Sequence, residues 1–309
     1  MRGAFVRGLV DIAREDERVV LLTADLGFMA LEPFAEAYPE RFLNVGVAEQ
    51  DMVGVACGLA EAGFLPFCYS IATFASMRGY EFIRSAAVLH RLPIRVVGVG
   101  GGFEYGPAGA SHHGLEDIGL MRLQPQICLI APADYSQTLS AVKATWDMPG
   151  PVYYRIGKDD RRKVPGLDGH FELGKPDVLG DGADLLLLST GAVSVEAAGA
   201  VQKLAAKGVR TTLAIVSTLN PSPGADLLAL LGDFPVAITV EAHRVSGGLG
   251  SLVCEVIAEN RLRCQAVRVG VSGPPTAVTG SEAYLLRRHG LDRDSLTTTA
   301  LNVLAGTYA

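Results

Sequence analysis

The sequence predicts an α/β protein of two domains, each built on a parallel or mixed sheet. The chain has 309 residues, a length that usually divides into about two domains. Two series of short apolar runs alternate with helical patterns, which is typical of parallel strands joined by helices. A polar stretch with Pro165 and Pro176 separates the two series. We therefore expect a first domain over residues 1–160, a linker over 161–178 and a second domain over 179–309.

In the first half, residues 2–14 carry apolar side chains at helical spacing, among them Phe5, Leu9 and Ile12. Residues 19–24 form a short apolar run, which predicts a buried strand. A long helix of small residues at 47–62 is ended by Gly63. The other expected strands are 42–45, 64–69, 94–99, 127–130 and 152–156, and the other expected helices are 31–38, 72–89 and 135–145.

The second half shows the same alternation without a sequence repeat. Asp184 precedes an apolar run that predicts a strand at 185–189, and Gly208 ends the helix predicted at 193–207. The other expected strands are 211–216, 236–240 and 266–269, and the other expected helices are 225–231, 249–258, 281–289 and 294–304.

Composition excludes several classes of function. Lys and Arg number 27 against 33 Asp and Glu, and the resulting net charge of −6 argues against a nucleic-acid-binding module. No uninterrupted apolar run approaches the roughly 18 residues of a membrane span, and residues 1–5 lack the apolar region of a signal peptide. The 5 cysteines form no CxxC pair, so we interpret them as reduced thiols. These features predict a cytoplasmic protein.

Glu49 lies where a predicted strand has ended, Gly46 turns the chain and an apolar helix begins. A glutamate at this place commonly caps the helix and complements its dipole. The helix continues through residues 52–60 with almost no polar side chains. A carboxyl group packed there would lose solvation and hold its proton more tightly. The residues alone leave both interpretations open.

Residues 46–50 (GVAEQ), followed by GLA at 58–60, resemble the pyrimidine-domain signature of transketolase-type thiamine diphosphate enzymes. That group includes transketolases, deoxyxylulose-phosphate synthases and the β subunits of 2-oxo acid dehydrogenases. The resemblance covers essentially the whole chain and implies a pyrimidine-binding domain followed by a transketolase C-terminal-like domain. The other matching segments, in order, are ADL at 24–26, ATF at 72–74, GPAGASHHG at 106–114, APAD at 131–134, GPVYYR at 150–155, VE at 240–241 and GGLGS at 247–251.

The family holds the cofactor's diphosphate and its divalent metal in a separate domain with a Gly-Asp-Gly…Asn-Asn motif. The GDG at 180–182 here lacks the following Asn residues, and we interpret it as a turn. The resemblance therefore implies one half of a split enzyme. A partner subunit would bind the diphosphate and Mg²⁺ or Ca²⁺, sharing the thiamine diphosphate with this chain in an α2β2 assembly. This chain would also self-associate through both domains.

The resemblance gives roles to four cofactor-binding residues. Glu49 would hydrogen-bond the aminopyrimidine ring and, when protonated, favour its imino form. Phe74 would stack on that ring, Leu26 would be the apolar wedge that bends the cofactor, and Asp25 would lie beside it. Without the resemblance, core positions for Phe74 and Leu26 and a helix N-cap for Asp25 are the simpler interpretations.

Two adjacent histidines lie in the loop at 106–114. By resemblance, His112 matches a catalytic, substrate-facing histidine, and His113 replaces the family's usual Gln. Histidine titrates near neutral pH and therefore suits proton transfer. No third ligand with suitable spacing accompanies the pair, so we expect no metal site in this chain.

Substrate recognition rests on arginines and on departures from the family pattern. Arg155 aligns with a phosphate-binding arginine of transketolases, and Arg2 aligns with another; arginine suits bidentate contacts with oxyanions. Met29, Ala108 and the glycine run at 98–102 depart from sugar-phosphate transketolases. These changes favour a modified sugar or another 2-keto donor over an ordinary pentose phosphate.

We predict the pyrimidine-binding and C-terminal subunit of a split transketolase, which transfers a two-carbon ketol unit from a ketose to an aldehyde. The alternatives are a β subunit of a 2-oxo acid dehydrogenase and a scaffold of the same fold without activity. The ATF segment and the loop with both histidines favour transketolase, and the presence of Glu49 argues against the scaffold. The GGLGS turn at 247–251 could bind an anion at a helix start, but we interpret it as structural.

Overall fold

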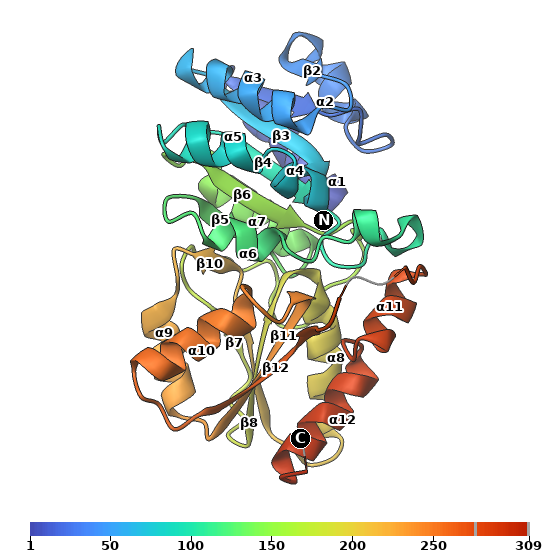
Figure 1. Cartoon of the computed structure of the whole chain (residues 1–309), viewed down its shortest axis with the longest axis vertical. Coiled ribbons are helices and arrows are strands. Elements are labelled where there is room, and N and C mark those ends of the chain that lie inside the picture. Colours follow the sequence, from blue (N-terminus) through green and yellow to red (C-terminus); the bar gives the residue numbers. More distant parts are fainter. Residues whose placement is uncertain (275–276, 308–309) are drawn as a thin grey trace.

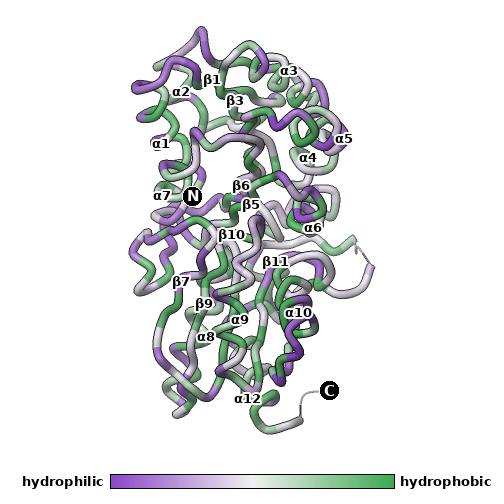
Figure 2. Tube along the Cα trace, turned by 90° about the vertical axis from the view of Figure 1, so that its left-hand side faces the viewer, coloured by the Kyte–Doolittle hydropathy of each residue, from purple (hydrophilic) through white to green (hydrophobic). Residues whose placement is uncertain are grey.

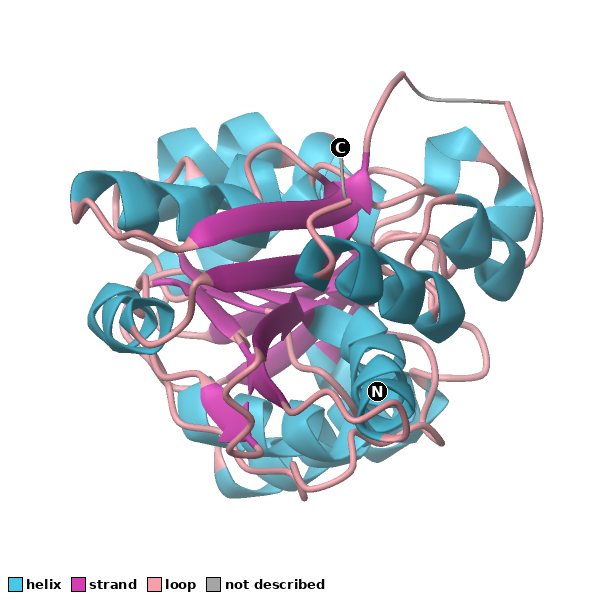
Figure 3. Ribbon diagram, turned by 90° about the horizontal axis from the view of Figure 1, so that it is seen from below, coloured by secondary structure: helices cyan, strands magenta, loops and turns pink. Residues whose placement is uncertain are grey.

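The computed structural model of the chain describes residues 1–274 and 277–307. The two α/β domains are stacked along the long axis of the molecule, the first in blue to green and the second in yellow to red (Figure 1). Seen from below, the strands form a central layer with helices on both sides (Figure 3). Ala309, the expected end of the second domain, lies outside the described residues. No helix in the described ranges is long and apolar enough to span a membrane.

The first domain contains a seven-stranded sheet with the order β10-β5-β6-β4-β3-β1-β2. Strands from the first half of the chain all pair in parallel. Strands such as β1 are buried along their whole length, which explains their uninterrupted apolar runs. The strands are β1 (Val19–Thr23), β2 (Phe42–Asn44), β3 (Leu65–Ile71), β4 (Arg95–Val99), β5 (Cys128–Ile130) and β6 (Val152–Ile156). The helices are α1 (Arg2–Glu15), α2 (Glu32–Ala37), α3 (Glu49–Glu61), α4 (Ala72–Met77), α5 (Tyr80–Phe82), α6 (Asp117–Arg122) and α7 (Tyr135–Thr145).

The helix expected over 72–89 is interrupted. It consists of α4, α5 and a π-helical segment η2 (Ile83–Val88). Gly79 lies at the first break, and a Cβ atom there would come within 2.8 Å of Val53 Cγ2 on α3. Glycine therefore permits a close approach of the two helices at this point.

The seventh strand of the first sheet, β10 (Thr218–Asn220), comes from the second half of the chain. It pairs antiparallel with β5. The Asn220 side chain fixes this pairing, since its Nδ2 donates to the carbonyl oxygens of Gln124 (2.9 Å) and Ile127 (2.7 Å). A strand from the second half of the sequence therefore completes the sheet of the first domain.

The second domain contains a five-stranded sheet with the order β12-β11-β8-β9-β7. Edge strand β7 pairs antiparallel with β9 and begins inside the stretch expected to be a linker. Figure 2 shows hydrophobic residues concentrated along the strands in both domains. The strands are β7 (Asp177–Leu179), β8 (Leu185–Thr190), β9 (Thr211–Ile215), β11 (Val236–Arg244) and β12 (Gln265–Val271). The helices are α8 (Ser194–Ala205), α9 (Gly224–Gly232), α10 (Leu249–Glu259), α11 (Glu282–Arg288) and α12 (Arg293–Leu304).

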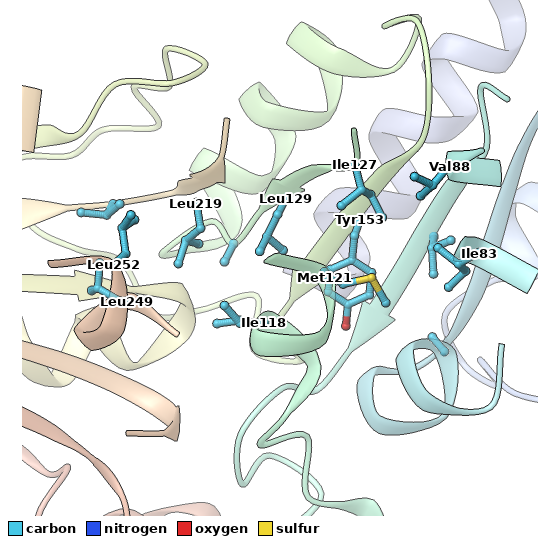
Figure 4. Packing of buried hydrophobic residues seen from close by; sticks show 14 of the residues in the cluster. Ile83, Val88, Ile118, Met121, Ile127, Leu129, Tyr153, Leu219, Leu249 and Leu252 are labelled. Atoms are coloured by element: carbon cyan, nitrogen blue, oxygen red, sulfur yellow. The ribbon is translucent and has the colours of Figure 1, made fainter. Parts of the chain in front are cut away.

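A continuous apolar cluster joins the domains (Figure 4). Ile118 and Leu129 of the first domain lie in the same cluster as Leu219, Leu249 and Leu252 of the second half. Because burying apolar surface is the main force that holds packed layers together, this cluster fixes the two sheets relative to each other.

Candidate active site

The parallel strands of the first sheet bring four predicted site residues to one edge. Asp25 follows β1, Glu49 begins the helix after β2, Phe74 lies in the helix after β3, and His112 lies in the loop after β4. The carboxyl ends of parallel strands meet at the same edge of a sheet, where open α/β proteins place their ligands. These four residues, which are far apart in the sequence, therefore lie at the same edge of the sheet.

Glu49 is the most buried member of the group, with 2% of its surface exposed. Its Oε1 accepts a 3.0 Å hydrogen bond from Ser70 Oγ on β3, and its Oε2 lies 3.0 Å from Arg78 Nη1. Both partners are side chains outside α3, so capping of that helix does not account for the position of Glu49. A shallow pocket of ≈ 640 Å³ opens beside the carboxylate, lined by Val47, Ala48, Glu49, Gln50, Asp51, Arg78 and Phe82.

Phe74 is half-buried rather than a core residue. The guanidinium carbon of Arg78 lies 4.1 Å from the centroid of the Phe74 ring. The imidazole of His112 meets the same ring edge-on, with centroids 5.0 Å apart. Arg78 therefore links Glu49 to Phe74, and Phe74 contacts His112, so the three residues form one group whose roles stay predictions.

The His113 side chain points away from the group that contains His112 and packs against Phe103. It is 7% exposed, its ring lies 5.2 Å from the ring of Phe103, and Phe103 stacks on His289 at 4.9 Å. Burial lowers the pKa of His113, and burial likewise lowers the pKa of His289. The extended backbone at His113 turns its side chain away from that of His112. This position argues against the catalytic role expected for His113. Its contacts instead give it a packing role in the domain interface.

Asp25 and Leu26 lie on the loop after β1, which is strained and exposed. Asp25 has a left-handed backbone with φ of 56°, and its Oδ1 accepts a 3.0 Å hydrogen bond from Asn44 Nδ2. Asn44 Oδ1 in turn accepts from the backbone N–H groups of Asp25 and Gly46, at 2.9 and 3.0 Å. Asp25 does not cap α2, whose N-cap is Leu31. Leu26 is half-buried beside it, so neither of the simpler interpretations of these two residues fits fully.

Three large apolar side chains on the loops at this edge of the sheet form an exposed rim. Phe28, Met29 and Val47 are 74%, 90% and 73% exposed, on the loops after β1 and β2. Exposed large apolar side chains grouped at one edge are typical of interaction surfaces.

Arg155 has a different position from the one expected of a phosphate ligand. It is 4% exposed, and its Nε lies 2.8 Å from Asp117 Oδ2. Its Nη2 donates 2.9 Å hydrogen bonds to the carbonyl oxygens of Gly114 and Ala242. Since these contacts join the two domains and exclude solvent, burial argues against the predicted substrate contact of Arg155.

Arg2, the other predicted substrate arginine, is half-buried at the start of α1. That helix packs on the face of the sheet opposite to α3, in the cluster that contains Phe5 and Tyr69. Asp160, just after β6, accepts hydrogen bonds from the N–H groups of Gly3 (2.8 Å) and Ala4 (3.1 Å). The start of α1 is thus held at the same sheet edge as Glu49, and a substrate role for Arg2 stays a prediction.

The glycine-rich turn before α10 is filled by the chain itself. Glu241 accepts hydrogen bonds from the N–H groups of Leu249 (2.8 Å) and Gly250 (2.9 Å), so an internal carboxylate satisfies this helix start. Within residues 1–274 and 277–307, no group of three or more His, Cys, Asp or Glu side chains is arranged to hold a metal ion.

Two family models match the chain. The model described as "Transketolase, pyrimidine binding domain" matches residues 1–163, and "Transketolase, C-terminal domain" matches residues 174–296. The chain belongs to the transketolase family. The family and the fold class expected from the motifs are therefore confirmed.

Similar proteins of this family include separate subunits of comparable length. The chain is 36% identical over 299 residues to a putative transketolase C-terminal section from Methanocaldococcus jannaschii, covering 96% of this chain and 93% of that one. It is 34% identical over 307 residues to one subunit of the apulose-4-phosphate transketolase of Phocaeicola vulgatus, covering 97% and 96%. A solved structure of a split gene transketolase, an inactive beta4 tetramer, matches with a TM-score of 0.88 at 34% identity over 98% of both chains. These relatives favour a split transketolase subunit over a 2-oxo acid dehydrogenase subunit.

Proposed function

We propose that this chain is the pyrimidine-binding subunit of a thiamine diphosphate-dependent transketolase that moves a two-carbon ketol unit from a ketose to an aldehyde. The observation that carries the proposal is that Arg78 contacts both the buried carboxyl group of Glu49 and the half-buried ring of Phe74, at the strand edge of a transketolase-family fold. An aminopyrimidine needs this pair of surfaces, a hydrogen-bonding carboxyl group and an aromatic face.

The residues present fit the cofactor's pyrimidine half. When bound, thiamine diphosphate supplies the electron sink for breaking and forming a C–C bond next to a carbonyl. Glu49 then holds a proton at the pyrimidine ring nitrogen, and Ser70, 3.0 Å from its Oε1, orients the carboxyl group. Phe74 stacks on the ring, while Leu26 and Asp25 line the approach from the loop after β1. These are proposals for residues that the fold has brought to one edge.

His112 is the proposed proton carrier for the substrate. Its ring lies 5.0 Å from that of Phe74, and its Nδ1 lies 3.0 Å from Ser111 Oγ, so the hydroxyl orients the imidazole. An imidazole has one ring nitrogen that can donate a proton and one that can accept it, so it suits proton transfer. We place the sugar's oxygen atoms against His112 and propose Arg2 as a contact for an anionic group of the ketose. A phosphorylated or otherwise modified ketose agrees with the apulose-4-phosphate transketolase found among the relatives.

The diphosphate and its Mg²⁺ or Ca²⁺ are assigned to a partner subunit. The described part of this chain offers no group of three metal-ligating side chains, and its relatives include a split gene transketolase. The exposed rim of Phe28, Met29 and Val47 gives the partner an apolar surface next to the site. We propose an α2β2 assembly in the cytoplasm, in which two copies of this chain also contact each other.

Co-expression with the diphosphate-binding subunit tests the proposal. The complex, supplied with thiamine diphosphate and Mg²⁺, should transfer ketol units between members of a panel of ketoses and aldehydes. The Glu49→Ala complex should lose turnover. Acylation of a lipoyl group from a 2-oxo acid, with no ketol transfer, would contradict the proposal.

A further inference from the structure

Arg78 contacts both surfaces that define the proposed pyrimidine site. It follows α4 and lies four residues after Phe74, so the two side chains share one face of the helix. Its Nη1 lies 3.0 Å from Glu49 Oε2, and its Cζ lies 4.1 Å from the centroid of the Phe74 ring. One planar cation therefore covers the carboxylate and the aromatic face together.

A bound pyrimidine needs the same two contacts. The ring would stack on Phe74 and hydrogen-bond to Glu49, but Ser70 already occupies Oε1 and Arg78 occupies Oε2. Each carboxylate oxygen can accept a second hydrogen bond, so the space over the Phe74 ring, where the Arg78 guanidinium lies, decides which partner must move. Ser70 is completely buried on β3, whereas the Arg78 side chain is 47% exposed and has a long, flexible stem. Arg78 is the partner that can leave.

The guanidinium and a stacked pyrimidine would use the same space beside Glu49 Oε2 and over the Phe74 ring. The ion pair with Arg78 and the stacked pyrimidine therefore belong to two different states of the site.

We propose that Arg78 is the gate residue of the pyrimidine site, covering Glu49 and Phe74 until the cofactor's ring displaces it. This inference rests on the proposed function of the chain. Displacing the guanidinium breaks an ion pair and a cation–π contact, and this opposes cofactor binding in the native protein. Removing the guanidinium should therefore strengthen cofactor binding.

The test is the dissociation constant of thiamine diphosphate, measured by isothermal titration calorimetry with Mg²⁺ on the complex with the diphosphate-binding subunit. Arg78→Met keeps the apolar stem without the charge and should bind the cofactor about threefold to tenfold more tightly than the native complex. Arg78→Lys keeps a charge but loses the planar contact with Phe74 and should show a smaller gain. Arg84→Met, on the exposed side of η2, is the matched control for loss of one surface charge and should bind as the native complex does.

Weaker or unchanged binding in both Arg78 variants would overturn the gate, since Arg78 would then hold the cofactor or take no part. That result leaves the proposed function intact, because the native complex still binds. If neither the native complex nor the Arg84→Met control binds thiamine diphosphate, the proposed function fails and the gate fails with it. Thermal unfolding of each complex shows whether the variants are folded.

Discussion

Arg155 Nε lies 2.8 Å from Asp117 Oδ2 in the interior of the protein, where the two side chains are 4% and 0% exposed. The same guanidinium reaches Gly114 and Ala242, so one charge joins a strand, a loop and a strand of the other domain. Tyr153 OH adds a 2.9 Å hydrogen bond to Asp117 Oδ2. Through its contact with the Gly114 carbonyl oxygen, this buried pair positions the loop that carries His112 and His113.

Replacing one partner of this pair should destabilise the fold. Arg155→Met leaves Asp117 buried without its counter-charge, and we expect the free energy of unfolding to fall by about 3–5 kcal/mol in urea titrations. Arg161→Met, at a side chain that is 91% exposed, is the control and should change stability little. A normal unfolding midpoint for Arg155→Met, with weakened binding of a phosphorylated ketose, would restore the predicted substrate contact.

The two histidines of the loop should separate in activity. His112→Ala should lower the rate of ketol transfer by about 10²–10⁴-fold, because a proton-transferring group is lost. His113→Gln, whose side chain points into the domain interface, should keep the rate within a few-fold of the native complex. Steady-state kinetics on the assembled complex measures both. Equal losses in the two variants would place His113 in the site after all.

His113 and His289 should make the folding stability fall as the pH falls. Burial lowers the pKa of each below its ordinary 6.5, so the unfolded chain binds more protons than the native protein between the lowered values and pH 6.5. Stability is therefore fully present above about pH 6.5 and is lost as the pH falls through the lowered pKa values. The double variant His113→Gln/His289→Gln should show a smaller fall of the melting temperature between pH 7 and pH 5, followed by differential scanning fluorimetry. An unchanged fall would exclude these histidines as its source.

Glu104 should have the opposite effect and make the folding stability fall as the pH rises. Burial, together with the charge of Glu282, raises the pKa of Glu104 to about 8. The native protein then binds more protons than the unfolded chain between about pH 4.5 and 8, so stability declines as pH rises through that range. Glu104→Gln keeps an acceptor for the Lys158 N–H group, 2.6 Å from Oε2, and should raise the melting temperature at pH 8.5 but not at pH 5. Glu36→Gln, on the exposed side of α2, is the control, and equal effects in the two variants would contradict the assignment.

A helix and a strand with strong local sequence signals were predicted with the bounds that the structure has. The helix Tyr135–Thr145 has the expected bounds because Asp134 caps it, accepting a 2.9 Å hydrogen bond from Gln137 N. The strand Val152–Ile156 is equally well bounded by its apolar run. The strands β7 and β10 could not be predicted, since each has three residues and is defined by a distant antiparallel partner. Pairing with a strand that is distant in the sequence leaves no pattern in the local sequence.

The site was predictable only in part for the same reason. Glu49, Phe74 and His112 stand in motifs, and the parallel sheet places them together. Ser70 was missed, although a polar residue in the buried strand β3 was a signal, and so was Arg78, four residues after Phe74. The substrate contact expected of Arg155 stays a prediction against which its burial argues, because a motif shows which residue is present but not whether a counter-charge such as Asp117 buries it.

The exchange of the C2 proton of bound thiamine diphosphate for deuterium tests the central claim most directly. It reports cofactor activation, which the account assigns to the carboxyl group of Glu49, without requiring any substrate. In the complex carrying Glu49→Gln, exchange should slow by about 100-fold or more while the cofactor still binds. Glu61→Gln, an exposed carboxyl group at the other end of the same helix, should leave the exchange rate unchanged. Native exchange in the Glu49→Gln complex would contradict the account.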